Sequence, residues 1–181
     1  MITIRVSGAQ MRQPFDGCEE GFVWDVCHGA CCVPGPKGGA LERITIAMIG
    51  AGTHYRSGAD IVMSRECLCP HFTADYHCGM HGSPDKPWDC VVAPFTLSSN
   101  NLLGVYNRYR LLPCFKAGRA LPAYEAFRTS LVTLFGEAEA DRVSFLAATG
   151  TGIFEAQITE EVYRTVALVK EIEGIGRRVS S

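Results

Sequence analysis

The sequence predicts an α+β fold in which a small, metal-organised, cysteine-rich part with short strands precedes two or three helices. Three observations lead to this prediction. All nine cysteines lie at or before Cys114, short β-branched apolar runs typical of strands occur at Ile2–Val6, from Ile44 and around Ile61–Met63, and helical periodicity begins after Pro113. We therefore expect a cysteine-cluster region over residues 1–118 and a helical extension over residues 119–181 that packs on it as one structural unit.

Three short apolar runs in the cysteine-rich part are typical of strands. They are Ile2–Val6, the run "ITIAMIGAG" that starts at Ile44, and a short run around Ile61–Met63. The segment between residues 65 and 89 differs, because it is rich in His, Gly, Pro and Cys and has little apolar periodicity. Such a segment cannot build its own core, so we expect another organiser, such as a metal, to hold it.

Helical spacing of apolar residues marks the last third of the chain. The run "PAYEAFRTSLVTLFG" predicts a helix that stops at Gly136, and "EAEADRVSFLAATG" predicts a second that ends at Gly150. A third helix is expected to begin with Thr159 as its N-cap and to close at Gly174. Its apolar face would contain Val162, Val166, Val169 and Ile172.

Composition excludes several classes of function. The 17 basic and 19 acidic residues give a formal net charge of -2, which provides no field to attract nucleic acid or anionic lipid. No apolar run approaches the roughly 20 residues of a spanning helix, and the N-terminus lacks a secretion signal. We therefore expect a cytoplasmic protein with reduced thiols, and the odd number of cysteines also disfavours a disulfide framework.

The first cysteine motif lies in the stretch "WDVCHGACCVPGP", where Cys27, Cys31 and Cys32 fall within six positions. Thiolates are soft ligands that suit zinc, copper(I) and iron–sulfur clusters. Cys27 and Cys31 are spaced to approach one centre across a tight turn that Gly29 keeps free of bulk. The adjacent Cys31 and Cys32 favour a multi-iron cluster, two neighbouring ions, or one ligand beside a structural thiol.

The second motif, "CLCPHFTADYHCGMHGSPDKPWDC", combines with the first to resemble the YkgJ-like cysteine-cluster family, described as a zinc- or iron-chelating domain. The matching order is Cys69-Pro70, Phe72, Cys78, Pro87, Cys90 and then Pro94-Phe95, followed by a further cysteine in "RYRLLPC". The resemblance covers about residues 18–118. It implies metal binding through Cys27, Cys31, Cys32, Cys69, Cys78 and Cys90, with Cys67 and Cys114 as further candidates.

This chain departs from the family pattern in its first motif, which has three cysteines instead of four. Cys18 could stand in for the missing one, and Lys86 replaces the family's arginine before Pro87. One branch of the family is associated with lysine N-methylation of flagellin and an iron–sulfur cluster. This chain lacks most of that branch's length, so the resemblance implies metal binding without fixing a reaction.

An iron–sulfur cluster is the preferred cofactor and zinc is the alternative. Whether the protein is an enzyme stays open, because the centre could serve redox or methyl-transfer chemistry, a non-catalytic binding module, or a metal carrier within an assembly. A binding module would present its C-terminal helices to a partner protein, for example through Val162 and Val169. An enzyme without metal would instead need an activated cysteine, such as Cys27 beside His28. His71, His77 and His81 are expected to support ligands rather than act as ligands.

Overall fold

The structure is a computed structural model of the chain, and its fold is α+β, as the sequence predicts. It describes residues 1–18, 20–32, 44–46, 61–63, 72–81, 83, 86, 88–117, 119–150 and 152–166. Three expected strands are confirmed. Ile2–Ser7 forms β1, and β3 and β4, Ile44–Ile46 and Ile61–Met63, pair with each other in antiparallel fashion.

The main sheet has four strands in the order β5-β6-β1-β8. Their bounds in that order are Phe95–Leu97, Leu102–Val105, Ile2–Ser7 and Ile153–Ile158. β1 runs parallel to β6 and antiparallel to β8, and β5 is antiparallel to β6. Along β1, Ile4 and Val6 are buried while Thr3 and Arg5 are exposed, so one face of the strand contributes to the core.

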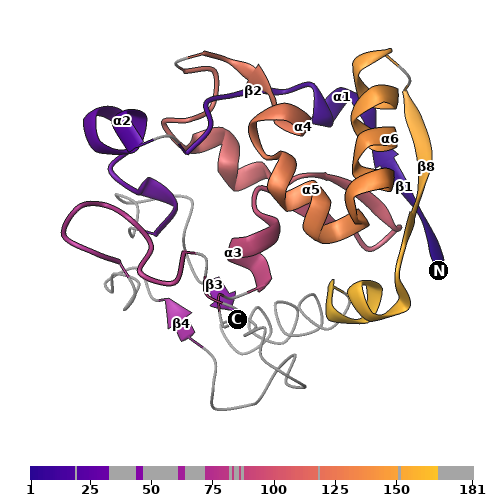
Figure 1. Cartoon of the computed structure of the whole chain (residues 1–181), viewed down its shortest axis with the longest axis horizontal. Coiled ribbons are helices and arrows are strands. Elements are labelled where there is room, and N and C mark those ends of the chain that lie inside the picture. The colour runs from indigo at the N-terminus through magenta and orange to yellow at the C-terminus, as the bar shows by residue number, and fades with distance from the viewer. Residues whose placement is uncertain are drawn as a thin grey trace, which may run out of the picture.

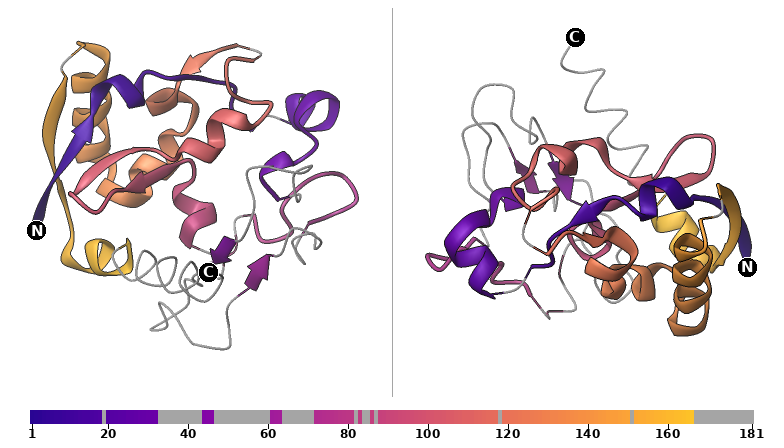
Figure 2. Two further views of the ribbon diagram at one scale, coloured as in Figure 1. Left: turned by 180° about the vertical axis from the view of Figure 1, so that it is seen from behind. Right: turned by 90° about the horizontal axis from the view of Figure 1, so that it is seen from above.

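Three helices after residue 122 pack beside this sheet, and Figure 2 shows them together on one side of β1. They are α4, Ala123–Ala126; α5, Arg128–Phe135; and α6, Glu137–Ala148. Leu131 of α5 and Val143 of α6 are fully buried in the same hydrophobic cluster as Ile4 and Val6 of β1. The principal core therefore combines residues from both ends of the chain.

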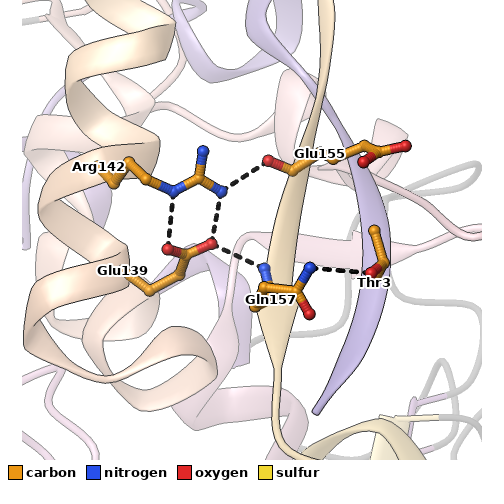
Figure 3. Close-up of polar contacts among 5 residues, drawn as sticks. All are labelled: Thr3, Glu139, Arg142, Glu155 and Gln157. Carbon is orange, nitrogen blue, oxygen red and sulfur yellow. Dashed lines mark hydrogen bonds and ion pairs between the residues drawn. The ribbon is translucent and has the colours of Figure 1, made fainter.

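A network of polar contacts joins α6 to the edge strand β8 (Figure 3). The Arg142 guanidinium donates two hydrogen bonds to the Glu139 carboxylate, at 2.8 and 2.6 Å, and one to the backbone carbonyl of Glu155 at 2.7 Å. Glu139 also accepts the backbone N–H of Gln157 at 2.7 Å, and the Gln157 amide donates to the Thr3 hydroxyl at 2.8 Å. The Arg142 hydrogen bonds hold the pKa of Glu139 below its ordinary value.

The third expected helix begins where the sequence predicts. Residues 160–166 are helical, and the Thr159 hydroxyl accepts the backbone N–H of Val162 at 3.2 Å. Val166 is buried and Val162 is partly buried against the core. Val169, Ile172 and Gly174 lie outside the described residues. Among the helices that the structure describes, none is long and apolar enough to cross a membrane.

In Figure 1, α2 lies on the opposite side of the molecule from β8, and α3 lies between them. The short elements of the first 122 residues have the following bounds: α1, Gly8–Met11; β2, Pro14–Phe15; α2, Glu20–Phe22; the π-helical turn η1, Val23–Cys27; the 3-10 turn η2, Ala30–Cys32; α3, Trp88–Val92; the 3-10 turn η3, Asn107–Leu111; and β7, Leu121–Pro122.

Candidate metal centre

The bend after η1 directs two backbone amides at one sulfur. His28 and Gly29 both have left-handed backbone conformations, with φ of 49° and 60°. This reversal lets the backbone N–H groups of Gly29 and Ala30 donate hydrogen bonds to the Cys27 sulfur. Amide N–H groups that converge on one atom favour negative charge there. The Cys27 sulfur is therefore placed to act as a thiolate once a cation accompanies it.

The loop that carries Cys78 packs directly on this bend. A β-bridge between Phe72 and Cys78 closes the loop, and its tip residue Tyr76 stacks on His28 with ring centroids 4.7 Å apart. Gly29 lies against the same loop so closely that a Cβ atom there would come within 2.4 Å of Phe72 Cε2. Two cysteine motifs that are distant in the sequence thus lie side by side.

Backbone pairing of residues 14–16 with residues 114–116 places Cys114 near the cysteine bend. The chain after β2 runs antiparallel to residues 114–116, because Phe15 bridges to Phe115 and the Asp16 N–H donates to the Cys114 carbonyl at 2.8 Å. Cys18 follows two residues after Asp16. This pairing joins segments about a hundred residues apart, and it sets Cys114 beside the approach to the cysteine bend.

The thiols of Cys18, Cys27, Cys31 and Cys114 lie close enough to interact electrostatically. Burial, together with smaller contributions from negative charge on Cys27, Cys18 and Cys31, raises the pKa of Cys114 to about 12. Desolvation likewise is the largest cause that raises the pKa of Cys18 to about 11, a value that already includes the charges of Cys31 and Cys27 and the opposing charge of Lys86. Cys18 keeps access to solvent at the surface, but protein surrounds it densely enough to disfavour its thiolate.

Cys27 shows the balance of these effects most clearly. Desolvation raises its pKa, the two amide hydrogen bonds oppose that shift, and the charge of Cys31 adds to it. Without a cation, burial favours the protonated form of Cys18, Cys27 and Cys114, and repulsion between neighbouring thiolates adds to this preference. A bound metal ion or cluster would reverse this balance, since thiolates that repel one another are attracted to a shared cation.

The sequence candidates fall into three groups. Cys27 and Cys31 are gathered with Cys114, one of the two further candidates, and with Cys18, which the sequence left undecided. Cys78 lies on the loop packed against the bend, and Cys90 lies in α3 with intermediate exposure. Outside the described residues lie Cys67, Cys69, His71 and the side chain of Cys32.

The remaining described histidines have local roles. His77 Nδ1 donates to the backbone carbonyl of Asp75 at 2.7 Å, and His81 is exposed. Among the described residues, no three His, Cys, Asp or Glu side chains already stand where they could hold one metal ion. The thiols of Cys18, Cys27, Cys31 and Cys114 lie near enough to interact electrostatically, but they would have to move closer together to coordinate one metal ion.

The position of Cys18 beside Cys114 could hardly be predicted from the sequence. Its only signal is that Cys18 could replace the cysteine missing from the first motif, whereas its proximity to Cys114 depends on the pairing of residues 14–16 with 114–116. In comparisons with family models, curated proteins and solved structures, the chain matches none of them.

Proposed function

We propose that this protein binds a metal centre through clustered thiolates, an iron–sulfur cluster in preference to zinc. The observation that carries the proposal is the arrangement around Cys27, whose sulfur accepts two backbone N–H groups while Cys18, Cys31 and Cys114 lie within electrostatic range. Four thiolates are the donor set of many zinc sites and of common iron–sulfur clusters. The soft donors fit either cofactor.

The preference for iron and sulfide rests on the number and spacing of the thiols. The chain has nine cysteines, more than one zinc ion uses, and Cys31 and Cys32 are adjacent. Neighbouring side chains diverge, which suits a centre with several metal atoms better than a single ion. Cys32, Cys67, Cys69, Cys78 and Cys90 remain candidates for additional ligands or for a second centre.

The number of protein ligands on the metal distinguishes a structural or electron-transfer centre from a catalytic one. A complete set of four protein thiolates supports a structural or electron-transfer role, whereas a catalytic centre would keep one metal position open. We therefore favour the non-catalytic alternative for a centre built on Cys18, Cys27, Cys31 and Cys114. The thiols of Cys18, Cys27, Cys78 and Cys114 are reduced, which suits the reducing cytoplasm in which we place the protein.

The proposed partner surface on the C-terminal helices requires a change from the sequence expectation. Val162 is partly buried and Val166 is buried, so these side chains pack on the protein's own core. Phe145 of α6, by contrast, is 66% exposed and is the large apolar side chain that α6 offers to a partner. A protein partner at these helices would contact Phe145 first.

The decisive experiment is metal analysis of protein purified without oxygen. We expect a coloured protein with visible thiolate-to-iron absorption and, for one cubane cluster, about four iron and four sulfide per chain. Cys18→Ser, Cys27→Ser, Cys31→Ser and Cys114→Ser should each lose most of the metal. Cys78→Ser and Cys90→Ser then show whether these two thiols belong to the same centre, because loss of metal in either variant would add that cysteine to the ligand set.

Two other outcomes would change the conclusion in different ways. A colourless protein with stoichiometric zinc would refute the iron–sulfur cluster and keep the thiolate centre. A chain that retains neither metal, even after anaerobic reconstitution with iron and sulfide or with zinc, would refute the proposal as a whole.

A further inference from the structure

A hollow of about 410 Å³ lies on the surface formed by α2, η1 and the 72–78 loop. Its lining residues are Gly21, Trp24, Asp25, Asp75 and His77. None of these described lining residues is a cysteine, lysine or arginine, so the four thiols around Cys27 do not form the described part of this hollow. It combines a large aromatic side chain with two carboxylates.

The aromatic part of the hollow is firmly built. Trp24 is 52% exposed, and its ring lies 5.4 Å from the ring of Tyr76. Tyr76 has a left-handed backbone with φ of 65° and stacks on His28, which is left-handed as well. Non-glycine residues hold this conformation only where their surroundings impose it. The contacts among these rings thus fix Trp24 beside the loop while half of its surface stays open to solvent.

The charged part of the hollow is negative. The Thr73 hydroxyl donates a hydrogen bond to the Asp75 carboxylate, which lowers the pKa of that carboxyl below its ordinary value. His77 Nδ1 donates to the Asp75 backbone carbonyl and lies 3.7 Å from the nearer carboxylate oxygen. Asp25 follows Trp24 in η1 and brings a second carboxylate to the same lining.

We propose that this hollow binds an organic cation, a guanidinium or alkylammonium group, against the Trp24 ring and between the carboxylates of Asp25 and Asp75. An indole face attracts cations through its quadrupole, and the two carboxylates add Coulomb attraction that an apolar ligand would not receive. The volume accommodates an arginine or lysine side chain or a small quaternary ammonium ion. This site is separate from the proposed metal centre and does not depend on the identity of the metal.

The test is a titration of the full-length protein as purified. The probes are N-acetylarginine methylamide, N-acetyllysine methylamide and tetramethylammonium chloride, and N-acetylcitrulline methylamide is the neutral counterpart of the first. Binding is followed by fluorescence and by NMR of the indole N–H signals, since the chain has two tryptophans and Trp88 is buried while Trp24 is exposed. We expect saturable binding of at least one cation with a dissociation constant of about 1–10 mM, a range typical of exposed sites.

The variants separate this site from nonspecific attraction. Trp24→Leu keeps apolar bulk without the π-system and should weaken cation binding about 2–5-fold. Asp25→Asn combined with Asp75→Asn should weaken it about 10-fold at low salt, and asparagine retains an acceptor for Thr73. Glu155→Gln, which removes an exposed carboxylate on β8, is the matched control and should leave binding unchanged.

Three results would each overturn the inference. They are the absence of saturable binding for all three cations, equal binding of the citrulline probe, or unchanged affinity in both the Trp24 and the aspartate variants. Thermal unfolding and near-ultraviolet circular dichroism of each variant check that it is folded. A variant that fails to fold is replaced by Trp24→Phe, whose smaller ring should still bind the cation more weakly than Trp24 does.

Discussion

Gly29→Ala tests the contact between the two cysteine motifs. Two separate costs apply to this substitution. The left-handed backbone at φ of 60° costs an alanine about 1–2 kcal/mol. The new Cβ would also lie 2.4 Å from Phe72 Cε2 and 2.7 Å from the Tyr76 carbonyl oxygen, an overlap that typically costs about 1–3 kcal/mol.

The two costs together predict a loss of about 2–5 kcal/mol in the stability of the packed bend, or its release by displacement of the 72–78 loop. The Tyr76 carbonyl oxygen is backbone, so this contact cannot be relieved by a side-chain rotation alone. Urea unfolding followed by tryptophan fluorescence measures the loss. The Trp24 signal in the folded protein reports displacement of the loop, because Trp24 contacts Tyr76.

Two other glycines provide matched controls. Gly150 has φ of 83° with nothing within 4 Å of the added Cβ, so Gly150→Ala measures the cost of a positive φ without a steric overlap. Gly21 has neither positive φ nor a close neighbour, so Gly21→Ala should be neutral or slightly stabilising. If Gly29→Ala proves no more destabilising than Gly150→Ala, and the Trp24 signal is unchanged, the inferred packing of the two motifs is wrong.

Three further predictions follow from the electrostatics and the burial pattern. In metal-free protein, the pKa values of about 12 for Cys114 and about 11 for Cys18 exceed the ordinary thiol value of 9.0. As the pH rises, these thiols therefore lose their protons in the unfolded chain before they do so in the folded protein. Their contribution to the free energy of unfolding should be constant below about pH 8.5. Above that pH it should fall by up to about 1.4 kcal/mol per pH unit for buried Cys114, and by less for exposed Cys18. Urea unfolding between pH 7 and pH 11 checks this, and a slope that Cys114→Ser leaves unchanged would contradict it. Arg142→Met should cost about 1–3 kcal/mol because it removes two hydrogen bonds to Glu139 within α6 and one to the Glu155 backbone carbonyl on β8. Arg164→Met breaks an exposed pair with Glu160 and should cost less than about 0.5 kcal/mol in the same unfolding assay. Amide hydrogen exchange should be faster in residues 72–81 than in α6, and metal loading should slow exchange in residues 72–81 selectively; equal slowing in α6 would contradict local action of the metal.

The sequence predicted strands and helices wherever a local pattern specifies them. The short runs at Ile44–Ile46 and Ile61–Met63 are strands, and the helix that ends near Gly150 forms as expected. The helix predicted to end at Gly136 is divided into α4 and α5, because the backbone of Phe127 departs from helical geometry. The Thr159 N-cap also forms, because a hydroxyl that accepts an N–H three residues later is a local interaction. These features depend on neighbours within a few residues.

Strands β6 and β8 were missed because their signals depend on distant partners. β6 contains Gly104, a residue that weakens strands in isolation. Here the Gln10 side chain occupies the space that a Cβ would fill, and its carbonyl oxygen accepts the Val105 N–H at 2.9 Å. In β8 only Ala156 and Ile158 are buried, so its apolar alternation is too sparse to read from the sequence alone.

The distribution of buried residues explains why a metal would matter in one part of this molecule. The sheet and α4–α6 share a continuous hydrophobic core, whereas none of the residues described between 72 and 81 is buried. That loop is positioned instead by the rings of Tyr76 and His28 and by close packing on Gly29. Such exposed contacts contribute little to stability compared with core burial. A thiolate centre at the bend would therefore add its binding energy beside the loop where the hydrophobic effect is weakest, and through Cys114 it would connect the bend to the hydrophobic core.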